Sequence, residues 1–253
     1  MAPNTLILGG TSEATALAST LSHDPRFDPL TSFAGRTSAI VPPSIPHRVG
    51  GFGGIEGLAA FLTANKVAAL VDATHPFSPQ ISAHAVAAAR RAGVPLLRLE
   101  RPPWVRREGD QWTEVDDMRG AAAALGLVPQ RVFLTIGKSE VDMFRIADQH
   151  TYLVRAIEGF DPGLRSARVI AARGPFDVED ERALLRREKI DIVVTKNSGG
   201  SATVAKLEAA RQRELQVVVV KRPTLEPAQT VATVDEALTW LGRHATLSTE
   251  RGE

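Results

Sequence analysis

Short apolar runs rich in Val, Ile and Leu alternate with Ala-rich segments of helical period along the whole chain. The runs are apolar throughout rather than alternating, which is typical of strands buried on both faces of a parallel sheet. The predicted strands cover residues 5–8, 30–33, 68–72, 95–98, 131–135, 151–155, 190–194 and 216–220. The predicted helices cover 12–22, 55–65, 79–92, 116–125, 139–147, 178–188, 201–213 and 234–243. Strands joined by crossover helices predict the α/β class with parallel sheets.

The second half of the chain resembles the first. Residues 6–13 (LILGGTSE) match 133–140 (FLTIGKSE), and 71–102 match 193–223 about 121 positions later. The second match aligns Thr74 with Thr195, and each copy then reaches an acidic helix start, at 115–117 and 234–236. We therefore predict two similar Rossmann-like halves with parallel sheets facing a cleft. The predicted boundaries give a domain at 1–128, a domain at 129–245 and a tail at 246–253.

The first turn between a predicted strand and helix reads GGTSEA, residues 9–14. On the dinucleotide-binding pattern G-x-G-x-x-G/A, Thr11 replaces the middle glycine and Ala14 fills the last position. Gly9 and Gly10 still permit a tight turn, and amides at a helix start favour phosphate. An ordinary glycine turn with Ser12 as helix N-cap is the alternative.

The end of the second predicted strand bears on the choice of nicotinamide cofactor. It reads SFAGRT, residues 32–37, and carries no acid that would accept from a ribose 2′-hydroxyl. Arg36 suits a 2′-phosphate instead, because its guanidinium donates two parallel hydrogen bonds. This pattern favours NADPH over NADH, with a solvated surface arginine as the alternative.

Two further turns follow predicted strands, where open α/β sheets place their ligands. DATHPF, residues 72–77, carries His75, which suits an acid near neutral pH or a phosphate donor, or a purely structural role. TKNSGG, residues 195–200, offers Lys196, Asn197 and Ser198 before two glycines, a set that suits an anionic ligand.

Composition limits the possible partners of the chain. The 253 residues hold 30 Lys plus Arg against 29 Asp plus Glu, so no overall field attracts nucleic acid or a membrane surface. The absence of Cys excludes a disulfide framework, a thiol nucleophile and a Cys-ligated metal, and the histidine spacing predicts no metal site. The N-terminus lacks the features of a signal peptide, so a cytoplasmic location is expected. Arginines within 90–107 and 155–173 suit a small polycarboxylate.

These motifs together resemble the precorrin-6A reductase family. GGTSEA at 9–14, AGRT at 34–37, DATHPF at 72–77, RGPF at 173–176 and TKNSGG at 195–200 occur in the family's order. The resemblance implies an NADPH-dependent oxidoreductase that reduces the precorrin-6A macrocycle to precorrin-6B during cobalamin biosynthesis. Its substrate is a tetrapyrrole with many carboxylates.

The resemblance also implies roles for individual residues. The cofactor-binding set is Gly9, Gly10, Thr11, Ser12, Glu13, Arg36, Thr74, His75 and Pro76. The substrate-binding set is Arg173, Thr195, Lys196, Asn197, Ser198, Gly199 and Gly200. His75 and Lys196 are the candidates for catalysis. The identity of the proton donor and the face of the nicotinamide stay open.

Two alternatives remain open and a third is disfavoured. One is a cobalt-precorrin-6A reductase, and a second is a non-catalytic protein that binds NADPH or a tetrapyrrole. A nucleotide-dependent reductase or epimerase with a Tyr-x-x-x-Lys pair is disfavoured, because Tyr152 is the only Tyr and position 156 is Ala. A monomer is expected, although the sequence leaves the oligomeric state open.

Overall fold

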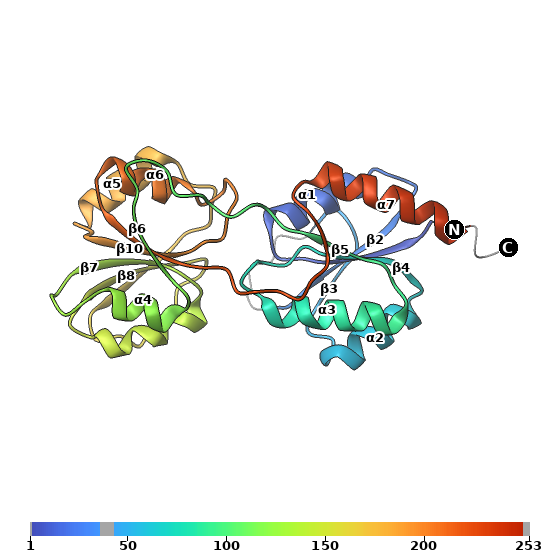
Figure 1. Ribbon diagram of the computed structural model, residues 1–253, viewed down its shortest axis with the longest axis horizontal. Helices are drawn as coiled ribbons and strands as arrows, with labels where there is room; N and C mark the ends of the chain where they lie inside the picture. Colours follow the sequence, from blue (N-terminus) through green and yellow to red (C-terminus); the bar gives the residue numbers. More distant parts are fainter. Residues whose placement is uncertain (1, 36–42, 250–253) are drawn as a thin grey trace. The chain divides into compact units, whose positions relative to one another are not determined.

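The computed structural model describes residues 2–35 and 43–249, and within them the chain forms two parallel six-stranded sheets (Figure 1). Each sheet belongs to one compact unit. Unit 1 comprises Met1–Pro102 and Thr224–Glu253, and unit 2 comprises Pro103–Pro223. The predicted α/β class and the two parallel sheets are confirmed. No helix in the described ranges is long and apolar enough to span a membrane.

Unit 1 has the strand order β12-β5-β4-β1-β2-β3. Its strands are β1 (Asn4–Leu8), β2 (Asp28–Phe33), β3 (His47–Val49), β4 (Val67–Asp72), β5 (Leu96–Leu99) and β12 (Gln229–Val231). Helices α1 (Ser12–Leu21) and α7 (Val234–Thr249) cover one face, and α2 (Gly54–Ala64) and α3 (Pro79–Ala92) cover the other (Figure 1). A buried core lies on each face, one around Leu17 and Trp240 and the other around Leu62 and Leu70.

Unit 2 has the corresponding order β6-β11-β10-β7-β8-β9. Its strands are β6 (Gln111–Val115), β7 (Arg131–Thr135), β8 (Thr151–Ala156), β9 (Ala167–Ala171), β10 (Ile192–Lys196) and β11 (Gln216–Val220). Helices α5 (Val178–Arg187) and α6 (Ala205–Gln212) cover one face, and α4 (Met118–Ala124) and the 3₁₀ helix η1 (Lys138–Ala147) cover the other (Figure 1). The core between the sheet and α5 and α6 centres on Phe133 and Leu185.

The two halves exchange their last strand and helix. After β5 the chain passes into unit 2, where β6 pairs with β11, and after β11 it returns to unit 1, where β12 pairs with β5. The predicted boundary between residues 128 and 129 is therefore wrong, because β6 and α4 belong to unit 2 and β12 and α7 to unit 1. The predicted tail from residue 246 is also wrong in part, since α7 continues to Thr249.

Sheet register corrects the predicted internal alignment. Leu6 lies opposite Leu70 in unit 1, and Phe133, which matches Leu6, lies opposite Val193 in unit 2. Asp72 therefore corresponds to Thr195, and Thr74 does not. The offset of 121 holds only farther along, at β5 and β11.

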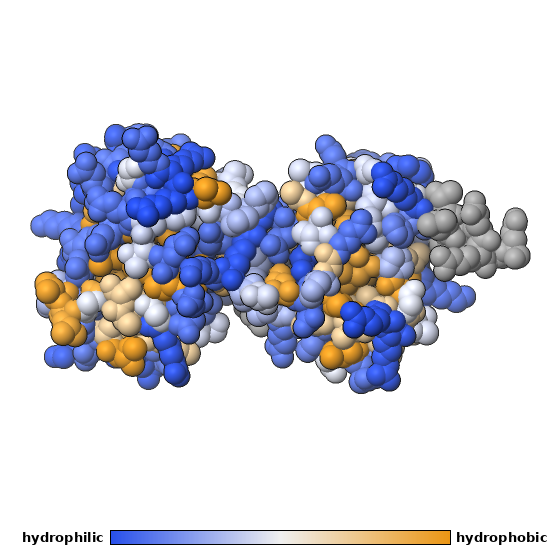
Figure 2. All heavy atoms as spheres, in the orientation of Figure 1, coloured by the Kyte–Doolittle hydropathy of each residue, from blue (hydrophilic) through white to orange (hydrophobic). Residues whose placement is uncertain are grey.

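The eight predicted strands are present, but four more were not predicted. They are β3, β12, β6 and β9, the two outer strands of each sheet. Each is short or largely exposed, so none has the continuous apolar run of a central strand. Hydrophilic residues cover most of the surface seen in Figure 2, with smaller hydrophobic patches on each unit.

Candidate functional site

In unit 1, two predicted motifs meet at the carboxyl ends of β1 and β4. The strand order runs outward in opposite directions from this pair, which makes it the topological switch point where such sheets bind ligands. The Thr11 hydroxyl donates to the Ala73 carbonyl at 2.8 Å and so joins the GGTSEA turn to the DATHPF turn. The structure therefore brings the predicted cofactor residues of both turns together.

The GGTSEA turn leads directly into helix α1. A Cβ added at Gly9 would lie 2.9 Å from Thr31 Cγ2, so the strand end has no room for a larger residue. Gly10 has φ +130°, and a Cβ there would meet open space. Thr11, and not Ser12, is the N-cap, since its hydroxyl accepts from the Ala14 amide at 3.1 Å. The turn thus leaves open space at Gly10, next to the N-terminus of α1.

A carboxylate lies within this turn and is balanced by an arginine. Glu13 Oε2 accepts from Arg101 Nη1 at 2.6 Å and from the Ser12 hydroxyl at 3.1 Å. Both charged side chains are largely buried, at 20% and 14% exposure. Arg101 therefore offsets a negative charge that would otherwise oppose phosphate binding at the helix start.

The DATHPF turn is held by a buried acid. Asp72 Oδ1 accepts from the Thr74 amide at 3.2 Å and from the Thr74 hydroxyl at 2.7 Å. The other carboxylate oxygen lies 3.6 Å from Nε of buried Arg98, which balances its charge. Asp72, the last residue of β4, therefore holds the Thr74 side chain in a defined orientation.

His75 is half-buried and has a defined tautomer. Its Nδ1 accepts from the Phe77 amide at 3.2 Å, so a neutral ring carries its proton on Nε2. Pro76, the next residue, is buried. Arg36, the predicted 2′-phosphate ligand, lies outside the described residues.

In unit 2, the predicted residues of TKNSGG lie at the carboxyl end of β10 and directly after it, at the corresponding switch point. Lys196 Nζ donates to Glu140 Oε2 at 2.9 Å, and the same oxygen accepts from the Gly137 amide at 2.8 Å. Thr195 is 1% exposed and donates to the Lys196 carbonyl, so its side chain faces the protein interior. The ammonium of Lys196 is thus already paired with a carboxylate.

Arg173 lies beyond the end of β9, in the RGPF segment. This segment contacts the TKNSGG region, since the Phe176 amide donates to the Ala202 carbonyl at 3.2 Å. A Cβ added at Gly174 would lie 2.7 Å from the same carbonyl oxygen. The structure therefore gathers the predicted substrate residues in one corner of unit 2.

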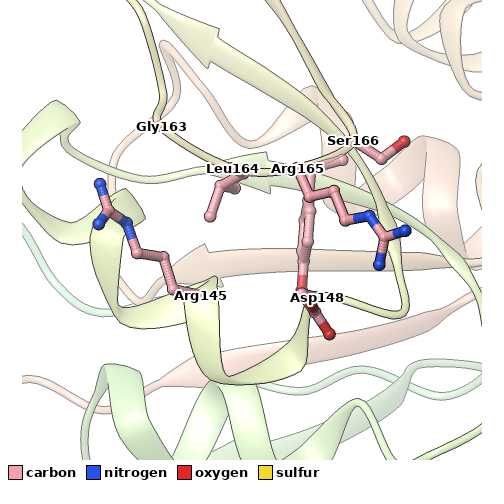
Figure 3. A pocket seen from close by; sticks show the side chains of 7 residues that line it. Arg145, Asp148, Gly163, Leu164, Arg165 and Ser166 are labelled. Atoms are coloured by element: carbon pink, nitrogen blue, oxygen red, sulfur yellow. The ribbon is translucent and has the colours of Figure 1, made fainter.

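Two other arginines of the predicted 155–173 stretch have different local environments. Arg155 forms a buried ion pair with Glu181 at 2.6 Å. Arg165 lines a pocket of about 200 Å³ with Arg145, Asp148 and Ser166 (Figure 3). This pocket lies at the amino ends of β8 and β9, at the opposite edge of the sheet from TKNSGG. The predicted polycarboxylate surface is therefore not continuous.

The comparisons with known proteins agree with this arrangement. The family model for precorrin-6x reductase CbiJ/CobK matches residues 4–242. A precorrin-6A reductase of Sinorhizobium sp is 48% identical over 238 residues, covering 93% of this chain and 91% of that protein. One from Rhodobacter capsulatus is 47% identical, with 98% of each chain covered. The chain belongs to the precorrin-6x reductase family.

A solved structure and a more distant relative place the chain within the family. The structure of a CobK precorrin-6A reductase superposes with a TM-score of 0.91 at 47% identity, covering 96% of this chain and 97% of that one. A cobalt-precorrin-6A reductase of Priestia megaterium is 28% identical over 247 residues. The chain is thus more similar to these relatives named precorrin-6A reductase than to this cobalt-precorrin-6A reductase.

Sequence reasoning missed two charged partners of this family member's motifs. Glu140 holds Lys196, and Arg101 holds Glu13. Signals for both were present, because Glu140 matches Glu13 in the internal repeat and Arg101-Pro102 recurs as Arg222-Pro223. Their roles became visible only once the strands were paired.

Proposed function

We propose that this chain reduces precorrin-6A with NADPH, adding a hydride to one ring carbon and a proton to its neighbour, as a step of cobalamin biosynthesis. The observation that carries the proposal is the identity of 47–48% to precorrin-6A reductases along nearly the whole chain. The lower identity to a cobalt-precorrin-6A reductase favours the cobalt-free substrate. The reaction is expected in the cytoplasm, with no nucleic acid or membrane partner.

The residues at the GGTSEA turn fit a dinucleotide phosphate. Gly10 leaves open space above the start of α1, and helix amides and dipole favour an anion at that place. Thr11 maintains the shape of the turn through its two hydrogen bonds, so we assign its hydroxyl a positioning role. NADPH bound there would supply the hydride from its nicotinamide ring.

His75 is our candidate for the proton donor. Its Nδ1 is occupied by the Phe77 amide, which leaves the proton on Nε2 of the neutral ring. The general acid is the imidazolium form, whose ordinary pKa lies close to 6.5, so Nδ1 must exchange the Phe77 hydrogen bond for a proton before Nε2 donates its own. Lys196 is our candidate for binding a substrate carboxylate, by exchanging Glu140 for the ligand as its ion-pair partner.

One assay tests the function directly. The purified chain is mixed with NADPH and precorrin-6A, and NADPH oxidation is followed by loss of nicotinamide absorbance. Oxidation that depends on both reactants supports the proposal. Binding of NADPH or the tetrapyrrole without oxidation would support a non-catalytic binding protein instead. Faster turnover with cobalt-precorrin-6A would support the cobalt branch.

The cofactor is tested separately at Arg36. If this arginine binds the 2′-phosphate, Arg36→Ala weakens NADPH by about 10- to 150-fold, the value of one charged bidentate contact. NADH affinity, measured by the same titration of nicotinamide fluorescence, stays within about twofold because NADH lacks that phosphate. An equal loss for both cofactors removes Arg36 from this role.

A further inference from the structure

The TKNSGG turn cannot be held by strand pairing alone. Beyond Lys196 the chain leaves the sheet, and Gly199 and Gly200 adopt left-handed φ values of +68° and +76°. One hydrogen bond, from the Asn197 amide to the Val220 carbonyl at 2.9 Å, ties the turn to the neighbouring strand. Within the turn, the Ser198 amide donates to the Lys196 carbonyl at 2.7 Å, whereas carbonyl groups farther along take partners from elsewhere in unit 2.

The side chain of Asn197 binds the backbone of Trp104. The Trp104 amide donates to Asn197 Oδ1 at 2.7 Å, and Asn197 Nδ2 donates to the Trp104 carbonyl at 3.0 Å. Asn197 is only 8% exposed. Its amide group thus imitates a strand neighbour for Trp104, and both ends of that group are engaged within the protein.

Two more side chains hold the carbonyl groups of the turn. The indole Nε1 of Trp104 donates to the Gly200 carbonyl at 2.8 Å. Arg222 donates from Nε to the Asn197 carbonyl at 3.0 Å and from Nη2 to the Ser198 carbonyl at 3.1 Å. Three carbonyls of one short turn are therefore fixed by Trp104 and Arg222.

The indole is itself well anchored. It packs against the core cluster of unit 2, and Lys206 Nζ lies 4.7 Å from the ring centroid. Lys206 is 4% exposed and also donates to the Thr203 carbonyl at 2.7 Å. A buried cation over an indole adds an attraction that holds the ring in place. Trp104 is thus a rigid support rather than a surface side chain.

We propose that Asn197, Trp104 and Arg222 are positioning residues for substrate binding, which fix the shape of the turn so that Lys196 and Ser198 meet the substrate. This inference rests on the proposed function. It assigns Asn197 a different role from the direct substrate contact expected from the sequence, because its amide already binds Trp104. Trp104 and Arg222, which lie outside the predicted motifs, thus affect substrate binding through the shape of the turn.

The first test uses Trp104→Phe in the full chain, which keeps an aromatic ring and removes the indole N–H. Trp112→Phe is the matched control, because Trp112 is buried in β6 and its Nε1 has no hydrogen-bond partner among the described residues. Without any ligand, amide hydrogen exchange of residues 195–203 is expected to become faster in Trp104→Phe and to stay unchanged in the control.

Kinetics separate positioning from general stability. Trp104→Phe is expected to raise the KM for precorrin-6A by about 2- to 12-fold, the value of one neutral hydrogen bond. The KM for NADPH and kcat stay within about twofold, since the cofactor turn lies in unit 1. Asn197→Asp, which keeps the acceptor and loses the donor, raises the same KM. In the double variant, the fold-increase in the KM for precorrin-6A is smaller than the product of the two single increases, because both substitutions act on one turn.

Each other outcome has a defined meaning. Unchanged exchange and an unchanged KM for precorrin-6A in Trp104→Phe overturn the proposal, as does an equal rise in both KM values. If Trp104→Phe does not fold, Arg222→Gln gives the same test, because it removes the bonds to Asn197 and Ser198. A wild-type chain that oxidises no NADPH with precorrin-6A refutes the proposed function, whereas the exchange result still decides whether Trp104 holds the turn.

Discussion

His75 and Lys196, the two side chains expected near the reacting atoms, have different chemical surroundings. His75 accepts a backbone hydrogen bond that leaves its proton on Nε2, whereas Lys196 is paired with Glu140. A residue that transfers a proton affects kcat, and one that binds a carboxylate affects KM. The local contacts therefore predict distinct kinetic effects for the two substitutions.

His75→Ala is expected to lower kcat by about 10²- to 10⁴-fold with NADPH affinity intact, as for loss of a general acid. Lys196→Ala is expected chiefly to raise the KM for precorrin-6A. Steady-state kinetics and NADPH titrations measure both, with His23→Ala, an exposed histidine of unit 1, as control. A fall in NADPH affinity alone would make His75 a cofactor-turn residue, and changes below about twofold would leave it a structural one.

His150 links the stability of unit 2 to pH. It is 1% exposed, its Nδ1 accepts from the Gln130 amide at 3.2 Å, and its Nε2 lies 3.2 Å from the Gly126 carbonyl. Burial lowers the pKa of His150 from 6.5. Because the unfolded chain then binds the proton more readily, the stability contributed by neutral His150 is complete above pH 6.5. It declines as pH falls toward the lowered pKa.

His150→Gln is accordingly expected to unfold at a temperature that depends less on pH than that of the wild type. Thermal unfolding at a series of pH values below and above 6.5 measures this dependence. The exposed His23→Gln serves as control. A pH dependence equal to that of the wild type would show that other groups cause the acid sensitivity.

At the scale of elements, the exchanged helix α7 stabilises a sheet far from it in the sequence. Trp240 is 5% exposed and packs in one core cluster with Ile7 and Leu17 of unit 1. Its Nε1 also donates to Gln229 at 2.8 Å, which joins α7 to β12. The C-terminal segment therefore supports the strand and helix that form the predicted cofactor turn.

Trp240→Ala is expected to destabilise unit 1 by about 3–5 kcal/mol, the usual cost of removing a buried Trp side chain. Hydrogen exchange is expected to rise in β1 and α1 and to stay unchanged in β7 and β10. Trp112→Ala, which opens a comparable space in unit 2, is expected to give the reverse pattern. Faster exchange of unit 2 in Trp240→Ala would contradict the observed pairing of α7 with unit 1.

At the scale of the whole molecule, only unit 2 is continuous in sequence. Residues 103–223 contain all six strands of its sheet, whereas unit 1 needs both ends of the chain. A fragment of 129–245, the second domain predicted from the sequence, lacks β6 and α4. It would leave an edge of β11 unpaired and a face of the sheet partly uncovered.

The fragment 103–223 is therefore expected to unfold in one cooperative thermal transition with native-like circular dichroism. The fragment 129–245 is expected to show no cooperative transition. The full-length chain, measured in the same buffer, gives the reference spectrum. Cooperative folding of 129–245 would mean that β6 and α4 contribute little to the stability of unit 2.

Local patterns in the sequence are sufficient to predict the central strands, the covering helices and the motifs at the strand ends. Strands β1 and β4 are largely apolar and buried, and the GGTSEA and DATHPF motifs begin where these strands end, at Leu8 and Asp72. Parallel strands bring their carboxyl ends to one edge, so the grouping of the GGTSEA and DATHPF turns followed from chain order and sheet type.

The sheet that each edge strand joins, and the polar groups that meet at the strand ends, depend instead on contacts between distant parts of the folded chain. β6 and β12 are short or exposed, and their pairing depends on backbone hydrogen bonds that either sheet could offer. The partners Glu140 for Lys196 and Trp104 for Asn197 lie 56 and 93 residues away. No local periodicity encodes such contacts, because they arise when distant strand ends are brought to the same edge of a folded sheet.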